Sequence, residues 1–218
     1  RDPEMSRGLG DVYKRQVVVG YMFWGTLSAM ACTGITLKSQ NGTAVVARTI
    51  EWGGSNLNSQ YVIVPRGYSE QSFTPDGQNG MVFIARYGYV GLAVEQKEFI
   101  AEGINEAGLS AGLFYFPHYG EYEDYDKKVA DSSISDFQLV SWILGRCTTL
   151  EEVKEAVANV HIINIDSRAS TVHWRFADQT GRQLVLEIIG KETHFYENNL
   201  GVLTNSPGFE WHLTNLNN

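Results

Sequence analysis

Short runs of alternating hydrophobic and polar residues fill the first half of the chain, and this period-two pattern predicts β-strands. The runs are rich in β-branched and aromatic residues, and turn sequences such as Asn41-Gly42 and Asp76-Gly77 separate them. The expected strands cover residues 32–37, 43–50, 60–64, 81–86 and 109–116. Residues 118–131 are polar, and we expect them to form a solvated surface loop.

After this loop the pattern changes to the period of a helix. Residues 135–146 predict a mostly apolar helix, and a second helix is predicted to begin at Thr148-Thr149, where Glu151 and Glu152 complete a capping box. Strands are expected again at residues 171–176, 183–189, 193–196 and 200–203, whereas residues 213–218 indicate neither a helix nor a strand. Strands, a helix pair and further strands favour an α+β fold with helices packed on antiparallel sheets.

The segment before the first strand has the pattern of a secretory signal. Lys14 and Arg15 precede an apolar run over residues 17–31, which ends in the small-x-small sequence that a signal peptidase cleaves, Ala29-Met30-Ala31. The run is shorter than the roughly 20 residues that a bilayer core requires. We therefore expect residues 1–31 to comprise a signal peptide and, at its start, a non-native leader, and the product to be exported to the periplasm or the medium. Residues 32–218 are then the N-terminal part of a single domain.

Cleavage after Ala31 would make Cys32 the first residue, with a thiol and a free α-amine on one residue. The amine can accept the thiol proton, so this arrangement predicts an N-terminal nucleophile. Two other interpretations stay open. Cys32 could be the acylated residue of a lipid-anchored binding protein, although such signals usually have a bulky aliphatic residue where Ala29 stands. It could also form a disulfide with Cys147, although Cys147 lies in an apolar helical stretch where buried free thiols are common.

Two charged residues are candidates to assist the cysteine. A hairpin at Asn41-Gly42 would bring Arg48 back beside the start of the first strand, where its charge would favour the thiolate. Glu51 follows three residues later and could orient the α-amine through a hydrogen bond. From the residues alone, an ordinary exposed pair at a strand end is the favoured explanation of Arg48 and Glu51.

The composition limits the classes of molecule that the protein is expected to bind. The net charge of −8 argues against nucleic acid or an anionic membrane as the main partner, so the membrane is involved only through the signal peptide. The 11 tyrosines and 10 phenylalanines indicate a β-rich core or an apolar ligand pocket. We expect no metal and no cofactor, because the histidines lack ligand spacing: His118, His161, His173, His194 and His212.

Several ordered motifs resemble the choloylglycine hydrolases, the family of bile salt hydrolases and penicillin V acylases. The motifs are residues 32–34, 48–52, 64–67, 102–109 and, most specifically, 201–216. They extend from Cys32 to the end of the chain. The resemblance implies an N-terminal-nucleophile hydrolase with a four-layer αββα fold, here truncated at the C-terminus, and an enzyme that cleaves the C–N bond of a linear amide.

The resemblance also implies roles for individual residues. Cys32 matches the nucleophile that forms an acyl-enzyme, Arg48 matches an arginine against the thiol, and Asn205 matches an asparagine of the oxyanion site. Glu51 stands where the family usually has Asp. A further family arginine would lie beyond residue 218, so the fragment alone is expected to be inactive.

The substrate contacts implied by the resemblance are aromatic. Phe114 and Tyr115 replace an asparagine that many members carry, which resembles the Gram-negative branch, and Trp52 matches a tryptophan of the acyl pocket. The implied substrate is a small amide with a bulky apolar acyl group: a bile salt conjugate, penicillin V or an N-acyl homoserine lactone. The implied assembly is a homotetramer.

Overall fold

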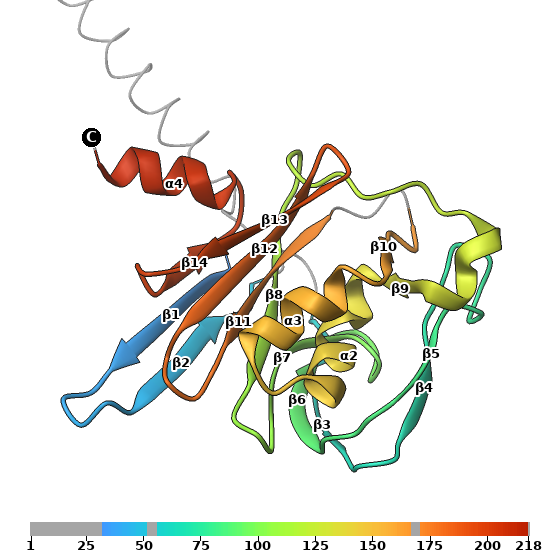
Figure 1. Ribbon diagram of the computed structural model, residues 1–218, viewed down its shortest axis with the longest axis horizontal. Coiled ribbons are helices and arrows are strands. Elements are labelled where there is room, and N and C mark those ends of the chain that lie inside the picture. The colour runs from blue at the N-terminus through green and yellow to red at the C-terminus, as the bar shows by residue number, and fades with distance from the viewer. Residues whose placement is uncertain (1–31, 52–55, 167–170, 218) are drawn as a thin grey trace, which may run out of the picture. The chain divides into compact units, whose positions relative to one another are not determined.

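The computed structural model describes residues 32–51, 56–166 and 171–217. The expected signal segment 1–31 and Trp52 lie outside these ranges. The main element is a seven-stranded antiparallel sheet with the strand order β13-β12-β11-β8-β7-β6-β3 (Figure 1). Its strands are β3 (Gln60–Val64), β6 (Tyr89–Ala93), β7 (Ile100–Asn105), β8 (Ser110–Tyr115), β11 (Val172–Ala177), β12 (Gln183–Ile189) and β13 (Glu192–Glu197).

A smaller sheet packs on the β8–β11–β12 part of the large one. It has the order β14-β1-β2, from β14 (Val202–Thr204), β1 (Thr33–Lys38) and β2 (Ala44–Thr49). The predicted hairpin is confirmed: Gly42 has a φ of +87°, which suits a turn glycine, and Gly34 pairs with Arg48 across the two strands. Buried residues join the sheets: Cys32, Phe114, Val185, Leu203 and Phe209.

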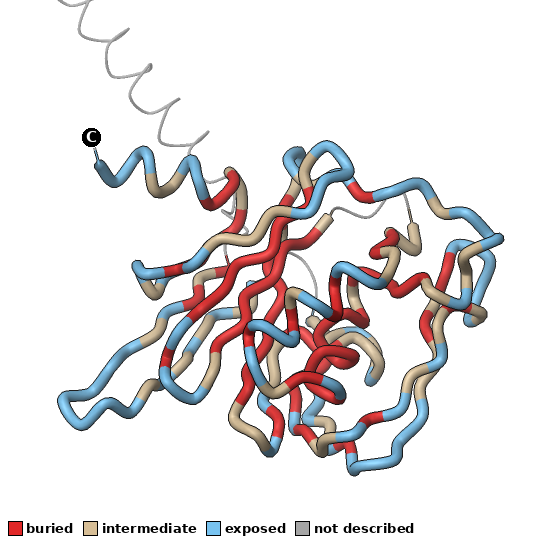
Figure 2. The backbone as a smooth tube through the Cα atoms, viewed as in Figure 1, coloured by how far each residue is buried: buried red, intermediate tan, exposed pale blue. Residues whose placement is uncertain are grey.

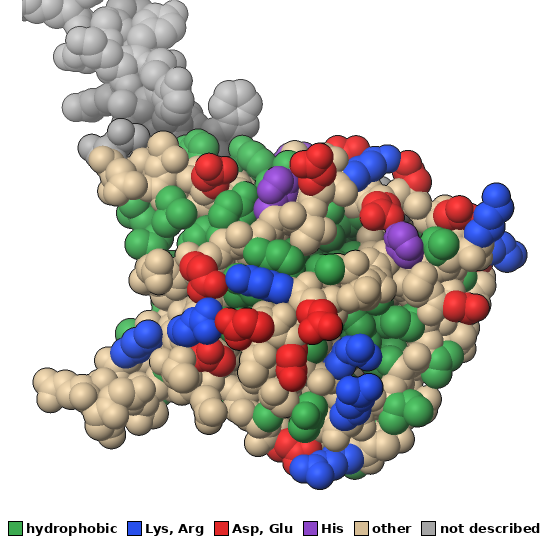
Figure 3. Space-filling view, viewed as in Figure 1, with side chains coloured by type: hydrophobic (Ala, Val, Ile, Leu, Met, Phe, Trp, Pro, Cys, Tyr) green, Lys and Arg blue, Asp and Glu red, His purple; other side chains and the backbone are tan. Residues whose placement is uncertain are grey.

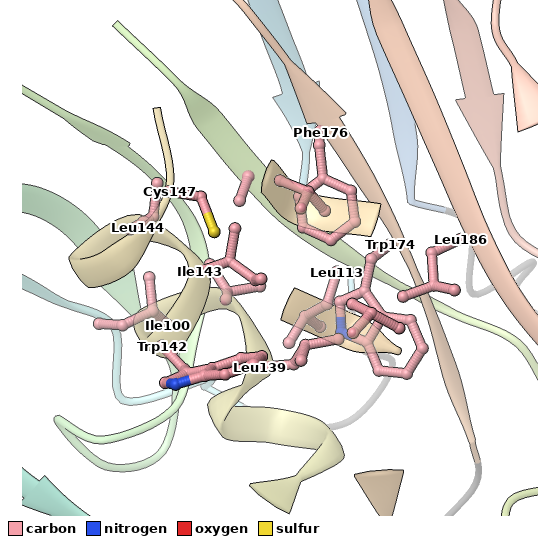
Figure 4. Packing of buried hydrophobic residues seen from close by; sticks show 14 of the residues in the cluster. Ile100, Leu113, Leu139, Trp142, Ile143, Leu144, Cys147, Trp174, Phe176 and Leu186 are labelled. Atoms are coloured by element: carbon pink, nitrogen blue, oxygen red, sulfur yellow. The ribbon is translucent and has the colours of Figure 1, made fainter. Parts of the chain in front are cut away.

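Two helices cover the opposite face of the large sheet. Helix α2 (Leu139–Arg146) is buried along nearly its whole length and packs on β7 and β8. Figure 4 shows its apolar side chains meeting those of the sheet. Helix α3 (Leu150–Val157) buries one stripe, as predicted. The capping box is also confirmed, because the Thr149 hydroxyl accepts a hydrogen bond from the Glu152 N–H at 3.1 Å and the Glu152 carboxylate accepts one from the Thr148 N–H at 2.6 Å.

The layers thus run from the helix pair through the large sheet to the small sheet, and burial is concentrated in the central strands (Figure 2). The α+β class predicted from the sequence is confirmed. The first expected helix was placed too early, because residues 133–138 form a short strand and a 3₁₀ turn before α2 begins. The remaining short elements are β4 (Ser69–Gln71), β5 (Val82–Ile84), β9 (Ser133–Ser135), β10 (His161–Ile163) and 3₁₀ turns over Lys127–Ser132 and Asp136–Gln138.

Two expectations from the sequence are wrong in part. Residues 213–218 were expected to lack a helix, but α4 (Phe209–Leu216) includes most of them. Its only buried residue is Phe209, so the apolar pattern that signals a helix is weak. The loop over residues 118–131 is mostly exposed, yet Tyr122 is buried, and its hydroxyl bonds both the N–H and the carbonyl of Val172 at 2.7 Å.

The outer strands of the large sheet present apolar side chains to solvent. Tyr61 and Ile63 on β3 are 91% and 79% exposed. They line an open groove of about 930 Å³ between the β1–β2 hairpin and strands β3, β6 and β7. By contrast, the surface over α3 and β13 carries interspersed acidic and basic side chains (Figure 3), including ion pairs from Arg182 to Glu151 and Glu197. No helix of the described ranges has the length and apolarity needed to cross a membrane.

Two buried carboxyl groups make the stability of the fold depend on pH. Burial raises the pKa of Asp136 from 3.8 to about 7, against hydrogen bonds from the Phe137 N–H and Ser135, and it raises that of Glu70 from 4.5 to about 7. In the unfolded chain both groups lose their protons near pH 4. The folded state therefore binds more protons between pH 4 and 7, and stability falls as the pH rises through this window.

The Asp136→Asn variant tests this dependence. Ionising the buried carboxyl costs up to about 4 kcal/mol, at roughly 1.4 kcal/mol for each pKa unit. We expect the free energy of unfolding of the variant to fall less than that of the wild type between pH 5 and pH 8, measured by urea unfolding. Asp131→Asn, at an exposed position, is the control and should follow the wild type. Parallel losses in all three proteins would contradict the assignment.

Candidate active site

Cys32 lies immediately before β1, between the two sheets. Its side chain is buried, and its Sγ atom lies 4.0 Å from the carbonyl oxygen of Glu51. The Thr204 hydroxyl on β14 donates a hydrogen bond to the Cys32 carbonyl at 2.9 Å. Both cysteines are free, so the structure gives no support to the disulfide interpretation. The thiol is therefore fixed between two neighbouring strands.

Arg48 on β2 lies beside this thiol, as the hairpin predicts. Its Nη1 atom donates to the Ala101 carbonyl at 3.1 Å and to the Leu113 carbonyl, and its guanidinium stacks 4.2 Å from the centre of the Phe114 ring. Burial lowers the pKa of Arg48, while Glu102 and the Cys32 thiol raise it through charge interaction and, for the thiol, a hydrogen bond. Arg48 remains a cation at physiological pH, because the arginine guanidinium does not lose its proton in proteins.

A cavity of about 220 Å³ opens onto Cys32 and Arg48. Apolar side chains form most of its wall, with the carboxyl-bearing Glu51 and Glu95 at its edge. The lining residues that the sequence did not single out are Ile50, Leu57, Val94, Glu95, Phe99, Ala101, Leu113, Phe137 and Val172. They come from strands and loops far apart in the chain, so no local motif marks them. A thiol and a cation at the wall of an apolar cavity fit a site that holds an apolar acyl group next to a nucleophile.

The other predicted catalytic residues lie close to Cys32. Thr33 pairs with Thr204, and continuing this antiparallel register puts Asn205 opposite Cys32. Asn205 is buried, and its backbone carbonyl lies 3.4 Å from His212 Nε2. Glu51 also lines the cavity and is exposed to solvent. The structure thus brings together Cys32, Arg48, Glu51 and Asn205.

The three aromatic residues predicted to contact substrate have different positions. Tyr115 lines the cavity. Phe114 does not, because its ring is fully buried between the sheets, under Arg48 and beside His173. Its position makes Phe114 a support for the Arg48 side chain. Trp52 lies outside the described residues.

A pair of charged residues behind Arg48 was missed by the sequence analysis. Arg175 on β11 is buried and donates from Nη2 to Glu102 Oε1 at 2.6 Å, and Glu102 Oε2 lies 3.8 Å from Arg48 Nη1. Burial raises the pKa of the Glu102 carboxyl, and the two guanidinium groups counteract this rise. The available signal was an arginine within the otherwise apolar strand sequence of residues 172–177, since a buried charge in a central strand needs a partner.

Gly112 on β8 makes room for this pair. It is the register partner of both Glu102 and Arg175, so the two charged side chains meet directly above it. A Cβ atom at Gly112 would overlap Glu102 Oε2 and lie 2.8 Å from its Cδ. The absence of a side chain at this position therefore permits the Glu102–Arg175 contact.

We expect Gly112→Ala to destabilise the fold by about 1–3 kcal/mol, because the added methyl group displaces the Glu102 carboxylate from Arg175. Urea unfolding measures the change. Gly88→Ala is the control, since a Cβ atom there would meet its nearest neighbour at 3.4 Å, an ordinary contact. Equal stabilities of the two variants would show that Glu102 relaxes without cost.

A second buried pair braces the segment that carries Asn205. His173 Nδ1 lies 2.9 Å from Glu187 Oε1, and its Nε2 lies 2.8 Å from the Thr204 carbonyl oxygen. Glu187 Oε1 also accepts a hydrogen bond from the Phe209 N–H at 2.9 Å, at the start of α4. These contacts tie β11 and β12 to both ends of residues 204–209. Among the described residues, no three His, Cys, Asp or Glu side chains are placed to hold a metal ion.

Comparisons with known proteins agree with this geometry. A family model described as linear amide C–N hydrolases, choloylglycine hydrolase family, matches residues 32–218. A bile salt hydrolase/transferase of Clostridium perfringens is 31% identical over 194 residues, which are 85% of this chain and 56% of that protein. The chain thus spans about half the length of the curated relatives it matches.

Solved structures show the same relationship. A variant of the conjugated bile acid hydrolase from Clostridium perfringens superimposes with a TM-score of 0.73 at 31% identity, covering 85% of this chain and 57% of that one. A penicillin V acylase from Agrobacterium tumefaciens gives a TM-score of 0.72 at 24% identity, covering 84% and 55%, and shows that the fold is shared.

Proposed function

The chain belongs to the choloylglycine hydrolase family of linear amide C–N hydrolases, and from this premise we propose that the intact protein hydrolyses a linear amide through Cys32. The observation that carries the proposal is the meeting of a buried thiol, a buried arginine and an apolar cavity at the start of β1. The proposal requires that residues 1–31 be removed during export, so that Cys32 has a free α-amine.

The proposed reaction has two stages. The α-amine takes the thiol proton as Sγ attacks the amide carbonyl, and the side-chain N–H of Asn205 stabilises the oxyanion that forms. The intermediate collapses to a thioester, and the protonated amine gives its proton to the departing nitrogen. Water then attacks the thioester with the α-amine as base, which releases the carboxylic acid and restores the thiol.

A pattern in two solved relatives supports the roles of Cys32 and Arg48. These are variants of the Clostridium perfringens enzyme, one with a cysteine replaced by alanine and one with an arginine replaced by leucine. The two replaced positions are sixteen residues apart in that protein, as Cys32 and Arg48 are here. Glu51 is proposed to hold the α-amine.

The cavity favours a substrate with a bulky apolar acyl group. Its wall includes the rings of Phe99, Tyr115 and Phe137, which bind flat or branched hydrocarbon better than a short polar chain. Relatives of this chain are named bile salt hydrolase/transferase and penicillin V acylase, and bile salt conjugates, penicillin V and N-acyl homoserine lactones are the candidate substrates for this protein.

A substrate panel tests the proposal. The complete open reading frame is expressed in an exporting host, and release of the free amine is measured for the three candidate amides and for N-acetylglycine. We expect hydrolysis of at least one bulky apolar amide and none of N-acetylglycine. A product with a diacylglyceryl group on Cys32 and no amide hydrolysis would support the lipid-anchored binding protein instead.

A further inference from the structure

The cluster behind the candidate nucleophile holds three charges, not two. Arg48 and Arg175 both approach the Glu102 carboxylate, at 3.8 Å and 2.6 Å, and the ring of Phe114 lies 4.2 Å and 5.6 Å from their guanidinium carbons. With the carboxylate ionised, as its short contact with Arg175 indicates, the cluster carries one excess positive charge. A single charge-balanced ion pair would be enough to fill this space between the sheets, so the excess charge needs its own explanation.

The cluster packs against the strand that follows Cys32, at a glycine. Gly34, two residues after Cys32, lies directly over it, since a Cβ atom on Gly34 would come within 2.7 Å of the Phe114 ring and 3.0 Å of Arg175 Nη1. Arg48, held by the carbonyls of Ala101 and Leu113, interacts with both the Cys32 thiol and the Glu102 carboxylate. Among the described residues, the charged groups of the cavity wall and of the cluster behind it are Arg48, Glu51, Glu95, Glu102 and Arg175.

Arg175 is costly to the fold. Its Nε and Nη1 atoms are buried and have no hydrogen-bond partner among the described residues, and a buried donor without a partner destabilises the folded state. The ion pair with Glu102 uses only the Nη2 atom and leaves these two donors without partners. The electric field of Arg175 offers an explanation for a charge at this position, because a buried cation acts on other charges over several ångströms in a medium of low dielectric constant.

We propose that Arg175 is a positioning residue for the nucleophile: it neutralises Glu102, so that the full charge of Arg48 acts on the Cys32 thiol. Without Arg175, the Glu102 carboxylate cancels Arg48, and the thiolate loses its stabilising cation. The electrostatic influences on the pKa of Arg48 agree with this proposal. Glu102 and the Cys32 thiol raise this pKa, and Arg175 lowers it. The inference rests on the proposed function of Cys32 and adds the residues that set its reactivity.

The test measures the thiol itself, without substrate. The rate of alkylation by iodoacetamide is followed from pH 5 to pH 10 in the full-length exported protein, and mass spectrometry assigns the label to Cys32. Cys147 does not interfere at neutral pH, because burial raises the pKa of its thiol to about 12. We expect Arg175→Met to slow alkylation at pH 7 about tenfold and to move the midpoint of the pH profile to higher pH. Arg175→Lys, which keeps the charge, should restore most of the rate.

The double variant Arg175→Met with Glu102→Gln distinguishes charge from packing. It removes both partners and leaves Arg48 uncancelled, so its alkylation rate should return to within about twofold of the wild type. Arg182→Met is the matched control, since Arg182 makes its ion pairs at the surface, and it should leave the rate unchanged. A double variant as slow as Arg175→Met overturns the proposal, because a structural role predicts additive losses.

If Arg175→Met does not fold, Glu102→Gln alone decides. It leaves two uncancelled cations and should raise the alkylation rate at pH 7, so an unchanged or lower rate overturns the proposal. These results are independent of turnover. Amide hydrolysis that survives Cys32→Ala would refute the proposed function while leaving the alkylation rates as they were measured.

Discussion

Cys32→Ala is expected to lower kcat of amide hydrolysis by at least about 10⁴-fold, because removal of a covalent nucleophile leaves only binding and oxyanion stabilisation. The fold should persist, since alanine fits the small buried site between the sheets. The expected stability change is about 1 kcal/mol, from the loss of one sulfur atom in a packed region. Turnover with a bulky apolar amide and urea unfolding measure the two effects.

Cys147→Ala is the matched control. Cys147 ends α2, is as buried as Cys32 and lies in the large core rather than at the cavity. Its replacement should cost similar stability and leave kcat unchanged. If the two variants lost activity equally, the effect would come from packing, and Cys32 would not be the nucleophile.

Asn205→Ala is expected to lower kcat by about 10²–10³-fold with a small change in KM, because an oxyanion donor acts on the transition state and not on the bound amide. The position of Asn205 depends on neighbours that the substitution leaves intact: Thr204 is held by His173 and, through its hydroxyl, by the Cys32 carbonyl. Steady-state kinetics over a range of substrate concentrations separates kcat from KM.

Asn198→Ala provides the comparison for this variant. Asn198 is also buried, but it bonds the Gly201 N–H and the Val202 carbonyl within the turn before β14. It should lower stability and leave kcat nearly unchanged. A fall in stability without a fall in kcat for Asn205→Ala would assign Asn205 to the turn and remove it from the oxyanion site.

The parts of the fold that could be predicted from the sequence have local causes. The Asn41-Gly42 turn fixes the β1–β2 hairpin and thereby the pairing of Gly34 with Arg48. The capping box at Thr149 fixes the start of α3. Strands β6 and β7 were missed, because glycines at positions 91 and 103 interrupt their apolar pattern. Those glycines follow from packing, since Cβ atoms there would meet Ile100 and Leu144 at 2.7 Å.

The candidate site likewise contains residues that could be predicted from the sequence and residues that could not. Cys32 and Arg48 were predicted from the sequence because an expected processing signal and a hairpin point to them, and Asn205 because its motif resembles that of a known family. Arg175 and the cavity wall were missed, because they meet only when β11 pairs with β8 and the small sheet covers both. Phe114 shows the reverse case: the family resemblance implied a substrate contact, whereas the sheets bury its ring under Arg48.

The most direct test of the N-terminal cysteine mechanism is the mass of the intact protein during turnover. The complete protein, produced in an exporting host, is mixed with a bulky apolar amide, quenched in acid and analysed by mass spectrometry with peptide mapping. The account predicts a chain that begins at Cys32 with a free α-amine and carries one acyl group on Sγ. A hydrolysing chain that retains residues before Cys32, or that has no acyl group on this thiol, would contradict it.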